Sequence, residues 1–352
     1  MIRVAIADDS PFTCNLLASY LEEGGGCKVV GVAHDTLSTL QLIRQQAPDV
    51  LTLDLQMPGG DGLDLLRQLA VEPPVSVVVI SGVTRLAAAT TLRALELGAV
   101  DFILKYTPGA PVSRASLRRE IVAKVKTAAA AHPANRPAFV AAPASLTSEL
   151  PRVAQRPART VAPPDAAGVV IIGASTGGPR AISDVLNQLS PDFATPCVIV
   201  QHLPASFTDP FATQLARQTR LRVRVAVPGN RLEAGVALVA PCSFHLVIRP
   251  DGHVNLQPPS ERDIYRPSID MAMISAAATY GASAVGVVLT GIGDDGAEGL
   301  KRIRDAGGEG FVQDPTSCIV PSMPERAIER AGADHVAYPG RIGQMLAIRS
   351  RA

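Results

Sequence analysis

The chain has 352 residues, of which 47% are hydrophobic, 18% charged and 4% aromatic, with a formal net charge of +1. This length predicts two domains with sizeable cores, and the near-neutral charge and scarce aromatics argue against a nucleic-acid partner. Five scattered cysteines without CxxC spacing (Cys14, Cys27, Cys197, Cys242, Cys318) favour the reducing cytoplasm over a disulfide framework. The N-terminus lacks a signal-peptide pattern and no uncharged apolar run is long enough to span a bilayer, so we expect no membrane insertion.

Residues 1–126 alternate short apolar runs with helical patterns. The predicted strands are Arg3–Ala7, Lys28–Ala33, Val50–Asp54, Val75–Ser81 and Asp101–Leu104, and helical patterns include Leu37–Gln46, Leu86–Leu97 and Ser113–Lys126. Strands that alternate with helices form a parallel sheet covered on both faces. We therefore expect residues 1–126 to be a doubly wound α/β domain with five parallel strands.

Residues 127–167 have a different composition. Seven prolines punctuate an alanine-rich, nearly acid-free stretch without a sustained apolar period. A structureless segment of roughly 40 residues is uncommon inside a compact domain. The composition therefore predicts an extended linker between two domains.

Residues 168–352 return to the alternation of strands and helices. The predicted strands are Val169–Ile172, Cys197–Gln201, Arg222–Val227, Val236–Ala240, Ala284–Thr290 and Gly310–Gln313. Within His245–Gln257, the Asp251-Gly252 pair lies between apolar residues, which is a hairpin signal. We expect a second α/β domain with a mostly parallel sheet and an antiparallel hairpin.

Polar side chains follow the strands of the first predicted sheet. Asp8 and Asp9 follow the first strand, Asp54 ends the third, Ser81 ends the fourth and Lys105 follows the fifth. The carboxyl ends of parallel strands meet at one edge, where ligands bind, and three carboxylates together favour Mg²⁺. Any one of these acids alone is typical of a solvated loop, but the set fits an aspartate that becomes phosphorylated. Asp54 would be the nucleophile, while Lys105 and Ser81 would hold the phosphoryl oxygens.

These positions resemble the receiver domain of two-component response regulators. The matching stretches are Asp8-Asp9-Ser10, Leu53–Pro58, Asp61-Gly62, Ser81 and Asp101–Lys105. The resemblance covers residues 1–126 and implies a flavodoxin-like fold, phosphorylation at Asp54, and Mg²⁺ held by Asp9 and Asp54. One residue departs from the pattern, since Tyr106 stands where the family usually has a proline that follows a cis peptide bond.

The stretch Val169–Gly178 places Ser175 among glycines, between a buried strand and a helical pattern that follows Pro179. A strand-to-helix turn holds a serine hydroxyl out of the backbone, near helix N–H groups that stabilise negative charge. This arrangement suits a serine nucleophile. It suits a phosphate site equally well, and a small hydroxyl can also simply fill a tight turn.

A serine nucleophile needs a base and an orienting acid. Of the six histidines, His202 directly follows the predicted strand Cys197–Gln201, so it shares a sheet edge with Ser175. The strand Ala284–Thr290 leads to Asp294 and Asp295, which the residues alone do not separate. The order serine, histidine, aspartate argues against the α/β-hydrolase fold, in which the acid precedes the histidine.

A rival interpretation concerns the glycines around the two aspartates. Gly291, Gly293 and Gly296 lie between a strand and a helix, and Asp314 follows the next strand, which imitates a dinucleotide-binding fingerprint. Asp294 and Asp295 would place negative charge where a pyrophosphate must approach. This favours the triad over an oxidoreductase.

The second half resembles the CheB family of chemotaxis methylesterases. The matching stretches are Ile172–Gly178, Gln201–Pro204, Arg266–Asp270, Leu289–Gly296, Gln313–Ser317 and Met323-Pro324. The resemblance implies Ser175 as nucleophile, His202 as base and, as the residue before Gly296, Asp295 as acid. It also implies an oxyanion site near Thr176 and Ile292, where the family has methionine in place of Ile292.

The two resemblances together imply a phosphorylation-activated serine hydrolase. Its substrates would be glutamate methyl esters, and by the same chemistry glutamines, on methyl-accepting chemoreceptors during chemotaxis adaptation. The esterase reaction would need no cofactor, and the chemotaxis histidine kinase CheA would be the phosphodonor. The alternative is a two-component regulator whose second domain only binds a partner.

Overall fold

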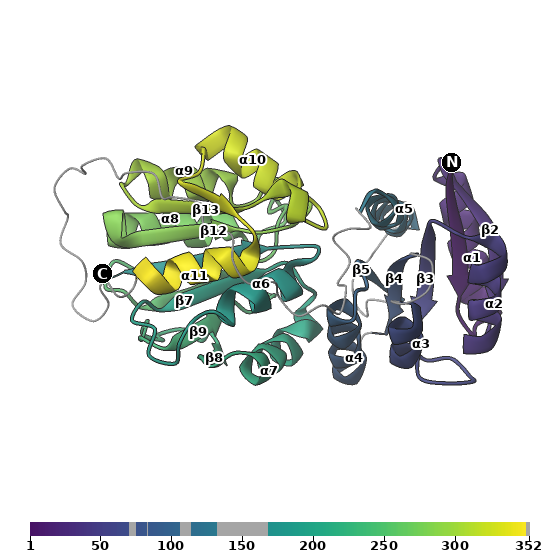
Figure 1. Ribbon diagram of the computed structural model, residues 1–352. Coiled ribbons are helices and arrows are strands. Elements are labelled where there is room, and N and C mark those ends of the chain that lie inside the picture. Colours follow the sequence, from purple (N-terminus) through teal and green to yellow (C-terminus); the bar gives the residue numbers. More distant parts are fainter. Residues whose placement is uncertain (70–74, 83, 106–113, 132–167, 350–352) are drawn as a thin grey trace.

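The computed structural model describes residues 1–69, 75–82, 84–105, 114–131 and 168–349, which form two lobes that lie side by side (Figure 1). The first lobe, purple to blue, contains the N-terminal α/β elements, and the second lobe, teal to yellow, contains the rest. None of the helices in these ranges is both long and apolar enough to cross a membrane.

The first lobe contains a five-stranded parallel sheet in the order β2-β1-β3-β4-β5. Its strands are β1 (Ile2–Ala7), β2 (Cys27–Ala33), β3 (Val50–Asp54), β4 (Ser76–Ser81) and β5 (Asp101–Leu104). Its helices are α1 (Pro11–Glu23), α2 (Thr36–Gln46), α3 (Gly62–Leu69), α4 (Arg85–Glu96) and α5 (Arg114–Ala130). The side chains of β1 alternate between the two faces. Val4 and Ile6 pack with residues of α1 and α5, while Ala5 and Ala7 belong to the cluster that contains α3 and α4.

The second lobe contains a seven-stranded parallel sheet in the order β14-β13-β12-β6-β7-β9-β8, and a separate antiparallel pair, β10-β11. Its strands are β6 (Val169–Ala174), β7 (Cys197–Gln201), β8 (Arg222–Val225), β9 (Val236–Val239), β10 (His245–Ile248), β11 (Val254–Gln257), β12 (Ala284–Val288), β13 (Glu309–Gln313) and β14 (His335–Ala337).

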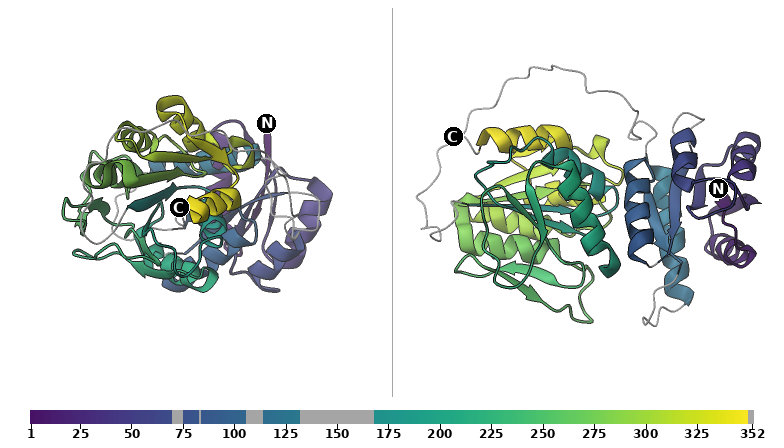
Figure 2. Two further views of the ribbon diagram at one scale, coloured as in Figure 1. Left: turned by 60° about the vertical axis from the view of Figure 1, so that its left-hand side comes forward. Right: turned by 90° about the horizontal axis from the view of Figure 1, so that it is seen from below.

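Helices cover both faces of this second sheet, as Figures 1 and 2 show. They are α6 (Gly178–Leu186), α7 (Thr208–Gln218), α8 (Ile269–Tyr280), α9 (Ala297–Asp305), α10 (Ser322–Ala331) and α11 (Pro339–Arg349), with short 3-10 turns η2 (Ala205–Phe207), η3 (Gly281–Ser283) and η4 (Pro315–Ser317). Helices α6 and α11 pack together on one side, and α8, α9 and α10 on the other. The central strands β6, β7 and β12 are fully buried, as expected for a sheet covered on both faces.

The sequence-based predictions of the elements are largely confirmed. Each predicted strand is present with ends within two residues of the prediction, and so is the hairpin. The short edge strand β14 was missed because three residues beginning with a histidine give no clear period. Helix α5 continues to Ala130, beyond the proposed boundary at residue 126. Tyr106 and residues 132–167 of the proposed linker lie outside the described residues, so the domain boundaries stay a prediction.

The interface between the two lobes is both apolar and polar. Helix α4 of the first lobe packs against α6, η2 and α7 of the second. The rings of Phe102 and Phe207 stack with centroids 4.6 Å apart, and both side chains belong to one continuous core cluster. The side-chain amides of Gln214 and Gln218 on α7 donate hydrogen bonds to Glu96 on α4. The lobes are therefore held against each other by burial as well as by polar contacts.

Candidate active site

Two neighbouring strands carry Ser175 and His202 to the same edge of the second sheet. Ala174 of β6 pairs with Gln201 of β7, so Ser175 and His202 are the next residues on adjacent strands. The N–H of Ser175 donates to the carbonyl of Thr290 at 3.0 Å. The turn into α6 requires Gly177, because its φ is +80° and a Cβ there would lie 2.8 Å from the side chain of Ile319.

The buried side chain of Gln201 ties these two residues together. Its Nε2 donates to the carbonyl of Ser175 at 2.8 Å and to the carbonyl of His202 at 3.2 Å. Only 2% of Gln201 is exposed. The sequence analysis gave this residue no role, although its place beside His202 at a strand end was a signal.

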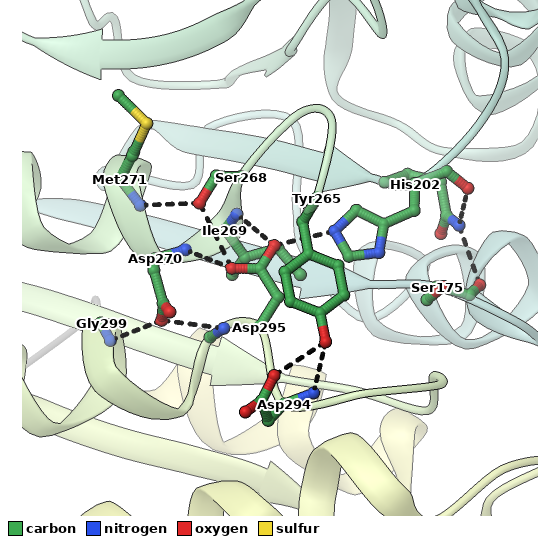
Figure 3. Close-up of polar contacts among 12 residues, drawn as sticks. Ser175, His202, Tyr265, Ser268, Ile269, Asp270, Met271, Asp294, Asp295 and Gly299 are labelled. Carbon is green, nitrogen blue, oxygen red and sulfur yellow. Dashed lines mark hydrogen bonds and ion pairs between the residues drawn. The ribbon is translucent and has the colours of Figure 1, made fainter. Parts of the chain in front are cut away.

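His202 is hydrogen-bonded to Asp295, whose side chain comes from the loop between β12 and α9 (Figure 3). The Nε2–H of His202 donates to Asp295 Oδ2 at 2.8 Å, and only 1% of Asp295 is exposed. The same carboxylate accepts the backbone N–H groups of Ile269 at 2.7 Å and of Asp270 at 2.9 Å, at the start of α8. These N–H groups at the start of α8 fix the position of the carboxylate beside the imidazole, at a helix end that favours negative charge.

The other ring nitrogen of His202, Nδ1, is turned toward Ser175 (Figure 3). Within the part of the chain that the structure describes, the hydroxyl of Ser175 makes no hydrogen bond to His202. Because Nε2 is already engaged by Asp295, Nδ1 is the nitrogen that can accept a proton. Catalytic hydrogen bonds are often long until substrate binds, so this geometry is compatible with a nucleophile–base pair.

The adjacent aspartate, Asp294, has a different partner. It accepts a hydrogen bond from the hydroxyl of Tyr265 at 2.7 Å, and the ring of Tyr265 stacks on His202. The ambiguity between the two aspartates thus has a geometric answer, since Asp295 and not Asp294 contacts the imidazole.

The N-terminus of α9 is occupied by another side chain of the protein. Asp270 Oδ1 accepts the N–H groups of Gly296 at 2.9 Å and of Gly299 at 2.7 Å. Burial, with a smaller contribution from the Asp295 charge, raises the pKa of Asp270 to about 6. Asp314 in turn caps the short helix η4 through the N–H of Thr316. The groups that a dinucleotide would need are therefore used within the protein, which argues against the nucleotide-binding alternative.

His245 supports the same region from behind. It is 2% exposed, its Nδ1 accepts the N–H of Ser268 at 3.0 Å, and its Nε2–H donates to Asp263 at 3.0 Å. Ser268 is the N-cap of α8. From the sequence, His245 is only the first residue of the predicted hairpin, and its contact with the helix start that holds Asp295 was not predicted.

A cavity of about 640 Å³ opens beside Ser175 and His202. Thr176 and Ile292 also line it, and their backbone N–H groups donate no hydrogen bond to any described residue. Backbone N–H groups without an acceptor, in residues that line a cavity beside a serine hydroxyl, are candidates to stabilise an oxyanion.

The first lobe contributes part of the wall of this cavity. Asp101, Lys105 and Lys124 line it together with Arg266 of the second lobe. The hydroxyl of Thr176 donates to Asp101 Oδ2 at 2.8 Å, so the residue directly after Ser175 is hydrogen-bonded to β5 of the first lobe.

The acidic pocket of the first lobe gathers the side chains that the sequence analysis placed there. Oxygens of Asp8, Asp9 and Asp54 lie within 4.8 Å of one another, a donor set of hard carboxylate oxygens that fits Mg²⁺. Lys105 Nζ lies 2.7 Å from Asp54 and 2.9 Å from Asp8. Burial raises the pKa of Asp54, partly offset by Lys105. For Lys105, burial lowers the pKa but the hydrogen bonds to Asp54 and Asp8 outweigh it, so the net direction is upward.

Ser81 connects this pocket to α4. Its hydroxyl is hydrogen-bonded to Thr91 on α4, with the oxygens 2.6 Å apart, and to the carbonyl of Gly82. It is buried at the end of β4, next to the strand that ends at Asp54.

Comparison with known proteins decides the family. Residues 170–346 match the family model of the CheB methylesterase and residues 4–116 match that of the response regulator receiver domain. The chain belongs to the CheB methylesterase family. A relative from Koribacter versatilis, named protein-glutamate methylesterase/protein-glutamine glutaminase 2, is 37% identical over 361 residues, with 100% of this chain and 97% of the relative covered.

Further relatives and a solved structure agree with this membership. A protein of the same name, numbered 3, from Burkholderia lata is 39% identical, covering 95% of this chain and 92% of its own length. The crystal structure of the Thermotoga maritima CheB methylesterase catalytic domain is 34% identical, with a TM-score of 0.50, covering 52% of this chain and 98% of that domain. The predicted fold class, a five-stranded receiver followed by a mostly parallel α/β methylesterase domain with an antiparallel hairpin, is confirmed.

Proposed function

We propose that this CheB-family protein is a phosphorylation-activated serine hydrolase that removes methyl groups from glutamate methyl esters of chemoreceptors and deamidates their glutamines. The observation that carries the proposal is that Ser175 and His202 follow adjacent strands at one sheet edge and that His202 is hydrogen-bonded to Asp295. Thr176 and Ile292 line the same cavity. The names of its full-length relatives supply the substrate class.

In the proposed reaction, His202 Nδ1 takes the proton from Ser175 Oγ as Oγ attacks the ester carbonyl. The negative charge on the carbonyl oxygen is stabilised by the N–H groups of Thr176 and Ile292, and Asp295 stabilises the imidazolium. When the tetrahedral intermediate collapses, the bond between the carbonyl carbon and the methoxy oxygen breaks. The proton on His202 passes to that oxygen, and methanol leaves. His202 then takes a proton from water as the water oxygen attacks the acyl carbonyl. The bond between the acyl carbon and Ser175 Oγ breaks, and His202 returns its proton to Oγ. The glutamate leaves as a carboxylate after its carboxyl proton passes to solvent. With glutamine as substrate the leaving group is ammonia.

The phosphorylation site would be Asp54, with Asp8 and Asp9 completing the acidic pocket. Mg²⁺, held by Asp9 and Asp54, would neutralise phosphoryl charge when bound. Lys105 and Ser81 would hold phosphoryl oxygens, since Lys105 already contacts Asp54. The chemotaxis histidine kinase CheA is the proposed phosphodonor.

Two connections support a regulatory link between Asp54 and Ser175. Lys105 directly follows β5, and Asp101 at the start of the same strand holds Thr176. Ser81 contacts Thr91 on α4, and the same helix holds α7 of the second lobe through Glu96. A new charge on Asp54 would draw Lys105 and Ser81 toward it, and so shift the two elements that hold the first lobe over the active site.

The cavity position supports the direction of the effect. The receiver residues Asp101, Lys105 and Lys124 form part of the cavity wall that Ser175 faces, and a glutamate side chain on a receptor helix must reach the same serine. Moving the first lobe away would open the site to a protein substrate. The five cysteines are all free, which fits the proposed cytoplasmic location.

The experiment that tests this function measures methanol release from methylated chemoreceptor, with and without acetyl phosphate and Mg²⁺. We expect the wild-type chain to release methanol faster with the phosphodonor, and Ser175→Ala to be inactive in both conditions. A fluorophosphonate should label the wild type and spare Ser175→Ala. Equal labelling of both proteins would reject the nucleophile, and an unlabelled, inactive wild type would favour a second domain that only binds a partner.

A further inference from the structure

The ring of Tyr265 lies flat against the imidazole of His202 (Figure 3). The ring centroids are 5.3 Å apart and the planes differ by 7°. Tyr265 belongs to the segment that precedes α8, whereas His202 follows β7. The fold therefore brings an aromatic ring onto the candidate base from a distant part of the chain. Tyr265 contacts the face of the imidazole, whereas Asp295 contacts its Nε2.

The position of this ring is fixed by a dedicated polar contact. The hydroxyl of Tyr265 donates to Asp294 Oδ1 at 2.7 Å and accepts the N–H of Asp294 at 3.2 Å. Burial, and then the hydrogen bond to Asp294, raises the pKa of Tyr265 above its ordinary value, so the phenol keeps its proton and remains a donor.

Gly293 leaves the space that the phenol needs. Its φ is +102°, and a Cβ at this position would lie 2.3 Å from the Tyr265 hydroxyl. The loop that contains Asp295 therefore also contains a glycine that leaves space for the Tyr265 hydroxyl and an aspartate that accepts its hydrogen bond.

We propose that Tyr265, held by Asp294, is a positioning residue for the hydrolase reaction, which fixes the plane of the His202 ring and stabilises its protonated form. This inference rests on the proposed role of His202 as the base. Rotation of an imidazole by half a turn about its Cβ–Cγ bond keeps the plane but puts ring carbons in the places of the two nitrogens. The hydrogen bond to Asp295 selects the orientation in which a nitrogen, Nδ1, faces Ser175 (Figure 3). The Tyr265 stack selects the plane, so the two contacts have separate effects.

The stack also acts on charge. A cation within about 6 Å of an aromatic centroid is attracted by the electrons of the ring, and the imidazole becomes a cation only after it takes the serine proton. The stack is therefore stronger in the transition state than at rest, which is the condition for a contact to increase the rate. The ring contact thus contributes beyond simple packing.

Other charged groups near His202 stay constant in the test. Asp295 and Asp294 contact the base or its stacked ring from the β12–α9 loop. The remaining charged groups that line the cavity are Asp101, Lys105, Glu120, Lys124 and Arg266. None of them is altered in the variants below, so a shift in the titration of His202 is attributable to Tyr265.

The test measures the second-order rate of fluorophosphonate labelling of Ser175 in the full chain between pH 5 and 8.5. It compares the wild type with Tyr265→Leu, Tyr265→Gln and Tyr265→Phe, and uses Tyr338→Leu, at an exposed tyrosine, as the matched control. For the leucine and glutamine variants we expect labelling roughly tenfold slower at pH 7. Their acid-side midpoint should be about half a pH unit lower, because the protonated imidazole loses its aromatic neighbour.

The phenylalanine variant separates the effect of the aromatic ring from that of the hydrogen bond to Asp294. It keeps the aromatic face, so its midpoint should equal that of the wild type while its rate falls by less than about threefold. Thermal melting checks that each variant is folded, and the glutamine variant replaces the leucine variant if leucine disturbs the fold.

Two results would overturn the inference. Wild-type rates in Tyr265→Leu and Tyr265→Gln would show that the ring does not position the base, and slower labelling with an unchanged midpoint would show a purely structural role. An unlabelled wild type would instead reject the proposed function itself, and with it the role of the base. The failures of the two proposals are thus distinguishable in one series of measurements.

Discussion

The acidic pocket around Asp54 and the candidate hydrolase site around Ser175 each lie at the carboxyl edge of a parallel sheet, one in each lobe. They differ in where their remaining residues come from. In the first, Lys105 contacts both Asp54 and Asp8, and each of these groups ends or directly follows a strand. In the second, strand ends supply Ser175 and His202, but the acid Asp295 is held by the start of α8. Sheet topology alone thus assembles the groups of the proposed phosphorylation pocket, whereas the proposed triad also depends on residues behind it that hold Asp295.

The two sites also differ in their surroundings. In the Asp54 pocket, the ammonium group of Lys105 balances part of the carboxylate charge, and under the proposed function this pocket would receive a phosphoryl group. The Ser175 site is enclosed by both lobes and is linked to the first lobe through Thr176 and Asp101. Under the proposed function the first site would control access to the second, and the following variants separate the two.

The largest effect is expected for Asp54→Asn, which removes the phosphoryl acceptor. Because the amide cannot form an acyl phosphate, the response of esterase activity to acetyl phosphate and Mg²⁺ should be lost completely. Activity without phosphodonor should remain within about twofold of the wild type, since Asp54 lies outside the Ser175 cavity. The measurement is methanol release with and without phosphodonor.

The control for this variant is Asp61→Asn, at an exposed aspartate near the same edge whose oxygen accepts the N–H of Leu63. The amide oxygen can keep that bond, so the response to acetyl phosphate should stay intact. An Asp54→Asn protein that still responds to the phosphodonor would contradict the proposed phosphorylation site.

A smaller effect is expected for Asp101→Ala, which removes the acceptor of the Thr176 hydroxyl. Asp101 also accepts hydrogen bonds from Lys124 and from the N–H of Phe102, but both of these lie within the first lobe, and only the bond to Thr176 joins the two lobes. Loss of that one hydrogen bond is worth about 1 kcal/mol, which shifts the equilibrium between the lobe arrangements by roughly fivefold. Activity of the unphosphorylated chain should therefore rise by about two- to fivefold, while the activity with acetyl phosphate stays unchanged. Methanol release under both conditions measures this difference.

Asp209→Ala serves as the comparison variant. Asp209 forms an ion pair with Arg85 between the lobes at 2.8 Å, but both side chains are more than half exposed (54% and 80%). Such pairs contribute little in water, so its basal activity should match the wild type. Equal basal activity in Asp101→Ala and the wild type would show that the Thr176 contact does not restrain the first lobe.

Much of the fold could be predicted because it depends on local pattern. Continuous apolar runs such as Val50–Asp54 and Cys197–Gln201 appear as fully buried strands, and the groups that follow them meet at the expected edges. The rule that parallel strands share a carboxyl edge therefore carried the prediction from sequence to site. Strand β14 escaped because three residues with a polar start carry no period.

The second layer of the hydrolase site could not be predicted for a physical reason. Tyr265, Asp270 and His245 lie on a loop, a helix start and a hairpin strand, and their roles depend on how α8 docks against the sheet. No spacing in the sequence encodes that docking. The stretch Arg266–Asp270 matched the family pattern, but the pattern did not indicate that its backbone N–H groups hold Asp295.

The smallest effect is expected for Asp270→Asn, which tests how the buried Asp270 carboxylate affects the stability of the folded protein. The pKa of Asp270 is raised to about 6 in the folded protein, against an ordinary value of 3.8. A raised carboxyl pKa means that the folded state binds the proton more tightly, so the contribution of Asp270 to stability falls as pH rises from about 4 to 6.

The asparagine cannot ionise, and its amide oxygen can still accept the N–H groups of Gly296 and Gly299. Relative to the wild type, Asp270→Asn should therefore gain stability between pH 4.5 and 7.5, by about 1 kcal/mol after allowance for its partial exposure, or a Tm increase of about 2–4 °C. Melting curves of both proteins at the two pH values measure it. A variant that instead loses stability relative to the wild type as pH rises would show that the charge of Asp270 stabilises the start of α9 more than its burial costs.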